Sequence, residues 1–148
     1  MLSLTKIFHF EMAHAIHGYP GVCKNIHGHS YELHVTVSSD RSDDDFIPGP
    51  GFMIDFKEVK KLVVESVIEK LDHKVVLSHQ FLLHNPSFLS PENLVTWKGE
   101  PTAENMLIFI QKMICEKIPE YVKLVSLKLY ETKDSYAEWK PGIAFNNY

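Results

Sequence analysis

Two segments in the first quarter of the chain alternate between apolar and polar positions, which is the pattern of half-buried β-strands. The first runs from Leu4 to His14 and the second from Ser30 to Val37. His27 and His29 precede the second segment and share the parity of its apolar residues. In the two segments the shared apolar faces carry Phe8, Phe10, Met12, His14, Tyr31, Leu33, Val35 and Val37.

Two later segments have the spacing of amphipathic helices. The first follows Asp55, an expected N-cap that forms a capping box with Glu58, and continues to about Leu71. The second opens at Pro101-Thr102 and ends before Pro119. The expected buried faces carry Val59, Leu62, Val63, Val67 and Leu71 in the first helix, and Leu107, Ile110, Ile114 and Ile118 in the second.

The remaining segments complete the expected order of elements. Residues 122–132 form a third long strand, and a short final strand is expected around residues 143–145. Residues 75–100 give no clear pattern apart from a short strand at 94–97, and residues 40–51 read as a charged turn and a loop. Strands, two helices and strands in this order favour an α+β fold, with both helices on one face of an antiparallel sheet.

Length and composition limit the classes of function. We expect one domain spanning residues 1–148, because 148 residues suit a single domain with a sizeable core. The net charge of −4 gives no electrostatic reason to expect a nucleic-acid partner. No apolar run approaches the ~20 residues of a membrane span. The N-terminus does not resemble a signal peptide, and two cysteines make no disulfide framework, so we expect a cytoplasmic protein.

Three histidines are candidate metal ligands. His27 and His29 are two residues apart, so on a strand their side chains point to one face. If the first strand pairs with this one, His14 can lie beside them. Three histidines with an open fourth position are typical of a catalytic zinc site. The alternative is that these are surface histidines beside a buried thiol, Cys23, because His-x-His alone is a weak signal.

The chain resembles the 6-pyruvoyl-tetrahydropterin synthase family, which includes the 6-carboxytetrahydropterin synthases of queuosine biosynthesis. The resemblance spans essentially the whole chain in six ordered blocks. These blocks are Phe10-Glu11-Met12-Ala13-His14, Cys23-x-x-x-His27-Gly28-His29-x-Tyr31, Asp55-Phe56, Leu71-Asp72-His73, Pro101-Thr102-x-Glu104-Asn105 and Tyr130-Glu131-Thr132.

The resemblance implies a fold and an assembly. The family has the tunnelling fold, a ββααββ unit that assembles into a barrel, usually as a homohexamer with active sites where subunits meet. It also implies that His14, His27 and His29 hold Zn²⁺. One departure is the long segment 78–100, which leaves its role open.

The resemblance also implies the catalytic and substrate-binding residues. Cys23 resembles the proton-abstracting thiolate, and Asp72 and His73 resemble the relay pair that works with it. Glu131 resembles the carboxylate that anchors a pterin ring through two N–H bonds. Two further residues, Thr102 and Glu104, match a block near the pterin pocket.

Four of these residues also have a plain structural explanation. Asp72-His73 at a helix end could provide only a favourable terminal charge. Thr102 could be only an N-cap, and Glu131 could be a solvent-facing strand residue. The other cysteine, Cys115, is expected to be a small core residue.

The spacing of the cysteine block favours one branch of the family. Three residues separate Cys23 from His27, and the 6-carboxytetrahydropterin branch has this short spacing. The resemblance therefore implies conversion of 7,8-dihydroneopterin triphosphate to 6-carboxy-5,6,7,8-tetrahydropterin, with release of acetaldehyde and triphosphate. The alternatives are a 6-pyruvoyl-tetrahydropterin synthase, which eliminates triphosphate, and a non-catalytic zinc-binding assembly module.

Overall fold

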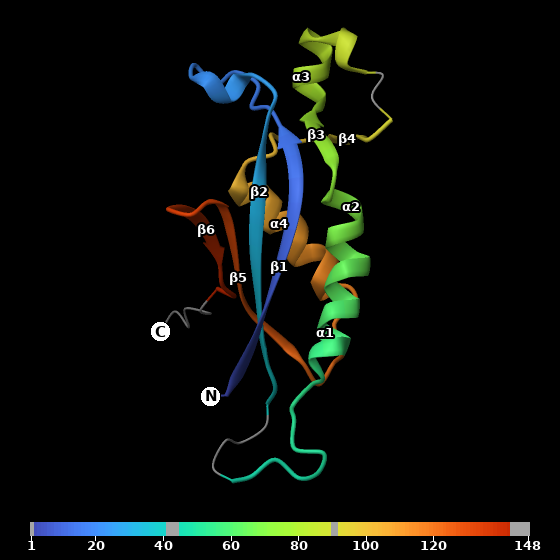
Figure 1. Cartoon of the computed structure of the whole chain (residues 1–148), viewed down its shortest axis with the longest axis vertical. Coiled ribbons are helices and arrows are strands. Elements are labelled where there is room, and N and C mark those ends of the chain that lie inside the picture. The colour runs from blue at the N-terminus through green and yellow to red at the C-terminus, as the bar shows by residue number, and fades with distance from the viewer. Residues whose placement is uncertain (1, 41–44, 90–91, 143–148) are drawn as a thin grey trace, which may run out of the picture.

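The computed structural model of the chain describes residues 2–40, 45–89 and 92–142. Within these ranges, one curved sheet carries six strands in the order β4-β3-β1-β2-β5-β6. Figure 1 shows the long central strands with the main helices behind them. The strands are β1 (Ser3–His14), β2 (His27–Ser38), β3 (Lys74–Ser78), β4 (Leu94–Trp97), β5 (Lys123–Thr132) and β6 (Ser135–Trp139).

The central pair of strands confirms the alternation seen in the sequence. β1 and β2 are antiparallel along their whole length, from Ser3 opposite Ser38 to His14 opposite His27. Their apolar side chains face the core together, and the rings of Phe10 and Tyr31 stack at 5.1 Å. The opposite face of this pair is mostly polar, because alternate residues of a strand point to opposite sides.

The expectation of an antiparallel sheet in a ββααββ order was wrong at one edge. β3 runs parallel to β1, and β4 runs parallel to β3, so the sheet is mixed. Both strands come from the segment 74–97, which showed no clear pattern in the sequence apart from the expected strand at 94–97. That strand is confirmed as β4. β3 is short, and Val76, Leu77 and Ser78 are all buried, so its polarity does not alternate.

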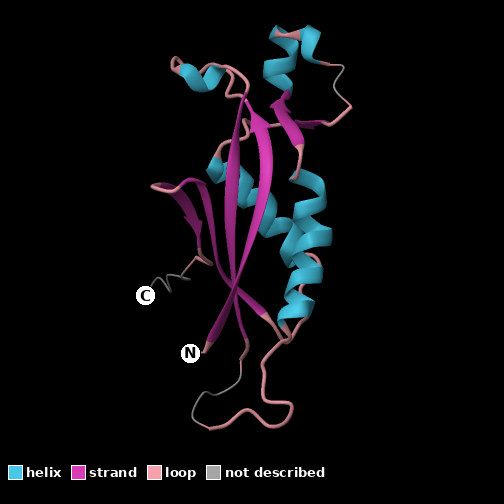
Figure 2. Cartoon of the chain, in the orientation of Figure 1, coloured by secondary structure: helices cyan, strands magenta, loops and turns pink. Residues whose placement is uncertain are grey.

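The two expected long helices lie on one face of the sheet, as Figure 2 shows. The first comprises α1 (Phe56–Val63), a π-helical turn η2 (Val64–Ile68) and α2 (Glu69–Leu71). The second is α4 (Ala103–Cys115). The Asp55 carboxylate accepts a hydrogen bond from the Lys57 N–H and caps α1.

The Glu58 carboxylate, expected to complete a capping box, accepts a hydrogen bond from the Tyr121 hydroxyl instead. Cys115, expected in the core, is exposed at the end of α4. Burial on the helices otherwise follows the predicted faces, although Leu62 and Ile118 are only partly buried. One core cluster joins both helices to β1, β2 and β5.

A small helical excursion projects beyond β3. It contains α3 (His79–His84) and the short turn η3 (Pro86–Phe88), and another short turn, η1 (Val22–Lys24), lies between β1 and β2. Ser78 caps α3 by accepting a hydrogen bond from the Phe81 N–H. A second, smaller core holds the excursion to the sheet; it consists of Ala15, Leu77, Phe81 and Leu82.

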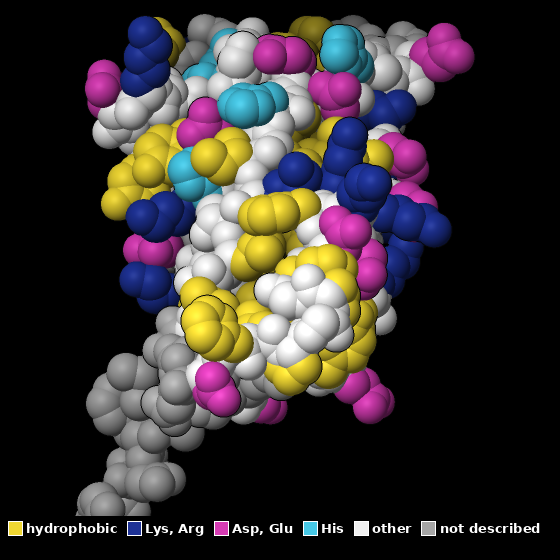
Figure 3. Space-filling view, turned by 60° about the horizontal axis from the view of Figure 1, so that its bottom comes forward, with side chains coloured by type: hydrophobic (Ala, Val, Ile, Leu, Met, Phe, Trp, Pro, Cys, Tyr) yellow, Lys and Arg dark blue, Asp and Glu magenta, His cyan; other side chains and the backbone are white. Residues whose placement is uncertain are grey.

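One strand near the C-terminal end of the described residues was not predicted. β6 occupies 135–139 and pairs antiparallel with β5, whereas the predicted strand at 143–145 lies outside the described residues. Within the described part of the chain, none of the helices is both long enough and apolar enough to cross a membrane. Figure 3 shows acidic, basic and histidine side chains interspersed with apolar ones on one face, without a broad field of positive charge.

Candidate metal and active site

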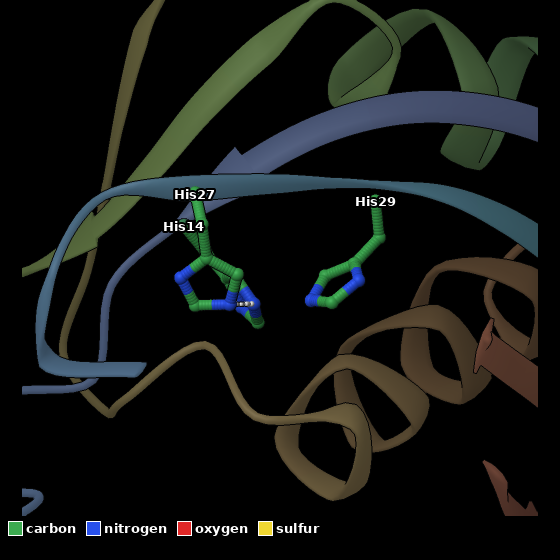
Figure 4. Close-up of side chains that lie close together, drawn as sticks. All are labelled: His14, His27 and His29. Carbon is green, nitrogen blue, oxygen red and sulfur yellow. Dashed lines mark hydrogen bonds between the residues drawn. The ribbon is translucent and has the colours of Figure 1, made fainter. Parts of the chain in front are cut away.

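The three candidate metal ligands converge beneath the sheet. The register of β1 and β2 places His14 directly opposite His27, and His29 follows on the same face of β2. One ring nitrogen from each residue lies within 4.8 Å of the others. Figure 4 shows the three rings pointing from the strands into a common space. The expected pairing of the strands is therefore confirmed at these residues.

Backbone carbonyls determine which nitrogens carry protons. His14 Nδ1 lies 2.7 Å from the Pro101 carbonyl oxygen, and His27 Nδ1 lies 2.8 Å from that of Asn25. A carbonyl oxygen can only accept, so both Nδ1 atoms carry the proton and donate. The unprotonated nitrogen of each neutral ring is then Nε2.

The two Nε2 atoms face each other at 3.1 Å. Two lone pairs at this distance repel unless a cation lies between them. Such a cation could be a proton or a metal ion, and burial disfavours a proton on His14 because it lowers the pKa of this residue, despite the opposing effects of the Pro101 carbonyl and Glu131. Two nitrogens on a tetrahedral zinc ion lie about 3.3 Å apart. The donor set, its spacing and its carbonyl partners therefore fit a zinc ion.

A carboxylate and a phenol lie beside the three histidines. Glu131 Oε1 is 3.9 Å from His14 Nε2 and accepts a hydrogen bond of 3.4 Å from the Tyr31 hydroxyl. Burial and the neighbouring Glu131 raise the pKa of Tyr31, so its hydroxyl keeps its proton and donates. The Glu131 side chain therefore lies against the three histidines and is only 28% exposed.

A cavity of about 300 Å³ opens next to Glu131. Its lining brings together four residues that the sequence analysis placed at the active site, namely Cys23, Thr102, Glu104 and Glu131. Cys23 reaches it from the turn η1, and Thr102 and Glu104 reach it from the start of α4. Thr102 is also the N-cap of α4, accepting a hydrogen bond from the Asn105 N–H, so its structural explanation is confirmed, while its contact with a substrate stays a prediction.

Asp72 and His73 form a pair in a different place. Asp72 Oδ1 lies 3.0 Å from His73 Nδ1 and accepts a hydrogen bond of 2.9 Å from the Glu11 N–H. Burial raises the pKa of Asp72, but these hydrogen bonds outweigh it and the net shift is downward. The His73 side chain is 79% exposed and lines another hollow, with Lys74 and Asn93. Within one chain, this pair therefore does not share the Cys23 cavity.

The backbone explains how His73 is presented. His73 has a positive φ of 57°, which few residues other than glycine adopt. Its N–H donates to the Glu11 carbonyl at 2.7 Å. The Glu11 N–H also donates to Asp72, so both residues of the pair are hydrogen-bonded to the backbone of Glu11 in β1. This attachment directs the imidazole outward.

Several residues of the site were not found from the sequence. Ile16, Tyr19, Ser135 and Tyr136 also line the Cys23 cavity. Tyr19 lies in a segment interrupted by glycine and proline, and the strand that carries Tyr136 was not predicted. Pro101 matched a block of the family, but the role of its carbonyl depends on contact with His14, 87 positions away.

Comparison with known proteins agrees with this geometry. A family model described as 6-pyruvoyl tetrahydropterin synthase matches residues 3–141. A Haemophilus influenzae protein named 6-carboxy-5,6,7,8-tetrahydropterin synthase is 30% identical over 145 residues, covering 95% of this chain and 99% of the relative. A Rickettsia typhi protein of the same name is 29% identical, covering 93% of this chain and 99% of the relative.

Solved structures share the fold at lower identity. An uncharacterised Wolinella succinogenes protein superposes with a TM-score of 0.75 at 19% identity, covering 95% of this chain and 98% of that one. A Caenorhabditis elegans 6-pyruvoyl tetrahydropterin synthase gives 0.69 at 20% identity, covering 95% and 96%. From the family match and the full-length relatives, we conclude that this chain belongs to the 6-pyruvoyl tetrahydropterin synthase family.

Proposed function

We propose that the protein is a zinc-dependent 6-carboxytetrahydropterin synthase of queuosine biosynthesis. It would convert 7,8-dihydroneopterin triphosphate to 6-carboxy-5,6,7,8-tetrahydropterin, releasing acetaldehyde and triphosphate. The observation that carries the proposal is the pair of facing Nε2 atoms of His14 and His27, next to a cavity lined by Cys23 and Glu131. Relatives that bear this enzyme's name match nearly the whole chain.

Glu131 is the proposed anchor for the pterin ring. Two oxygens of a carboxylate can accept two parallel N–H bonds from the amino-pyrimidine edge of a pterin. Tyr31 helps to hold the carboxylate in place by donating to Oε1. Thr102 and Glu104 lie on the same wall of the cavity and are proposed to contact the substrate.

His14, His27 and His29 would hold the zinc ion, and Cys23 would act as the base. When bound, zinc supplies Lewis-acid polarisation of substrate oxygens. The Cys23 thiolate would remove a proton from the substrate side chain, since the thiolate is the basic form of the residue. The cavity gives Cys23 access to a substrate whose ring lies on Glu131.

Asp72 and His73 are proposed to act on the substrate of a second subunit. The pair lies outside the Cys23 cavity of its own chain, yet the exposed imidazole is held in a defined direction. An assembly with sites between subunits, which we propose is a homohexamer, would bring the two together. Sedimentation showing a stable, active monomer at micromolar concentration would overturn this part of the proposal.

Product identification tests the reaction. The zinc-loaded protein would be incubated with 7,8-dihydroneopterin triphosphate, and the products identified by mass. We expect 6-carboxytetrahydropterin, acetaldehyde and triphosphate. A 6-pyruvoyl product would place the protein in the other branch, and no conversion by a zinc-loaded oligomer would favour the non-catalytic module. A His34→Ala variant is a suitable control, because His34 lies on the opposite face of β2 from His27 and His29.

A further inference from the structure

A second hollow, of about 680 Å³, lies between the turn around η1 and the helical excursion α3–η3. From the β1–β2 connection it is lined by His17, Tyr19, Lys24 and Asn25, and from the excursion by Phe81, Asn85 and Phe88. The excursion belongs to segment 78–100, in which the sequence departs from the family pattern. The hollow therefore combines the cysteine turn with a part of the chain that the proposed mechanism does not use.

This hollow adjoins the proposed active site. Tyr19 lines both the Cys23 cavity and the second hollow. Asn25, whose carbonyl accepts the proton of His27 Nδ1, is also part of its wall. The two hollows therefore meet at Tyr19, next to the turn that carries Cys23.

The chemistry of the wall suits an anion. Its lining residues include Lys24 and His17 but no aspartate or glutamate. Glu100 is the nearby acidic residue, and its carboxylate accepts a hydrogen bond of 2.8 Å from the His17 N–H.

The excursion supports the His17 ring. The His84 ring stacks on the His17 ring at 4.5 Å. His84 Nδ1 donates to the Gln80 carbonyl at 2.9 Å, which fixes the ring on which His17 stacks. The imidazole of His17, supported by His84, and the ammonium group of Lys24 thus lie at one hollow.

We infer that this hollow receives the triphosphate tail of the substrate, with Lys24 and His17 as its phosphate-binding groups and His84 as the residue that positions the His17 ring. The inference rests on the proposed function, which supplies a substrate with a neutral ring at one end and a polyanion at the other. Glu131 in the first cavity would repel phosphate, whereas the second hollow has no acidic lining residue. The two hollows therefore match the two ends of the substrate.

Binding measurements on zinc-loaded protein test the inference. Three ligands are compared by calorimetry: inorganic tripolyphosphate, 7,8-dihydroneopterin and, with turnover, 7,8-dihydroneopterin triphosphate. Lys24→Ala and His84→Gln are the test variants, and Lys57→Ala is the control, because Lys57 is an exposed lysine on α1. His84 is distant in sequence from Cys23, so its variant separates phosphate binding from a disturbance of the cysteine turn.

We expect Lys24→Ala to weaken tripolyphosphate binding and raise KM for the triphosphate substrate by about tenfold or more, the usual worth of a hydrogen bond to a charged group. His84→Gln should act in the same direction. The affinity for 7,8-dihydroneopterin should stay at the wild-type value in both. If both variants bind tripolyphosphate as Lys57→Ala does while the wild type is active, the subsite is wrong. A wild type that neither binds nor converts the pterins would instead overturn the proposed function.

Discussion

Removing the His27 imidazole is the sharpest test of the metal site. His27 Nε2 faces His14 Nε2 at 3.1 Å, and its Nδ1 is held by the Asn25 carbonyl. His27→Ala deletes one of three nitrogens that converge within 4.8 Å. It also removes the close approach of two lone pairs, so the variant should fold in the absence of metal at least as well as the wild type.

The loss in zinc affinity can be worked from the number of ligands. Four-ligand structural sites bind zinc with about 10–16 kcal/mol, or about 2.5–4 kcal/mol per ligand. Losing one of the three histidines should therefore weaken zinc binding by roughly 100- to 1,000-fold. His14 and His29 alone would then compete poorly with a chelator for the metal.

Competition with a chromophoric chelator at fixed pH measures this affinity directly. His34→Ala is the matched control, because it removes an imidazole from the same strand. His34 lies on the other face, where its Nε2 is 2.6 Å from Glu32 Oε1. The ligand assignment is refuted if His27→Ala keeps wild-type zinc affinity and stoichiometry. It is equally refuted if His34→Ala loses zinc to the same extent.

Three further outcomes are expected. Cys23→Ala should lower turnover by about 10²–10⁴-fold and leave zinc content unchanged; zinc lost with activity would make Cys23 a ligand. The lowered pKa of Asp72 stabilises the fold above its unfolded pKa of about 3.9, and this stability is lost as pH falls through the folded pKa. In urea unfolding, the free energy of unfolding of Asp72→Asn should be lower than that of the wild type by no more than about 1 kcal/mol, since the carboxyl is 35% exposed. This difference should shrink below pH ~4, and an equal difference at pH 3 and pH 7 would contradict the reasoning. Ile110→Ala, at a fully buried position, should cost about 2–5 kcal/mol, against about 0.5 kcal/mol or less for Ile108→Ala, which is 48% exposed on the same helix.

Local patterns were enough to predict the elements that carry most of the core. In the two long strands, apolar and polar residues alternate because one face of each strand is buried and the other is polar. In the amphipathic helices, apolar residues recur at helical spacing for the same reason. Thr102 and Asp55 were readable as N-caps because the groups that they satisfy lie within three residues. The π-helical turn within residues 56–71 could not be predicted from the sequence, since it keeps the same apolar face of the helix in contact with the core.

Strands β3 and β6, toward the two edges of the sheet, could not be predicted from local patterns. β3 is buried without alternation and is stabilised by parallel partners, β1 and β4, that are distant in the sequence. β6 follows β5 after a two-residue connection and pairs with it. Its residues are largely exposed, so its sequence does not show the apolar–polar alternation of a half-buried strand. For such strands, pairing with a neighbour rather than local polarity determines the structure.

The sequence by itself determined the residue types of the site: three histidines with strand parity, a cysteine four residues before His27, and a carboxylate at Glu131. Only the tertiary structure decided that the register pairs His14 with His27, and that carbonyls of Pro101 and Asn25 turn both Nε2 atoms toward each other. It also decided that Asp72 and His73 lie apart from Cys23 in the same chain. The reason is physical: side-chain chemistry is a local property, whereas distances between side chains follow from strand register and packing between segments far apart in the sequence.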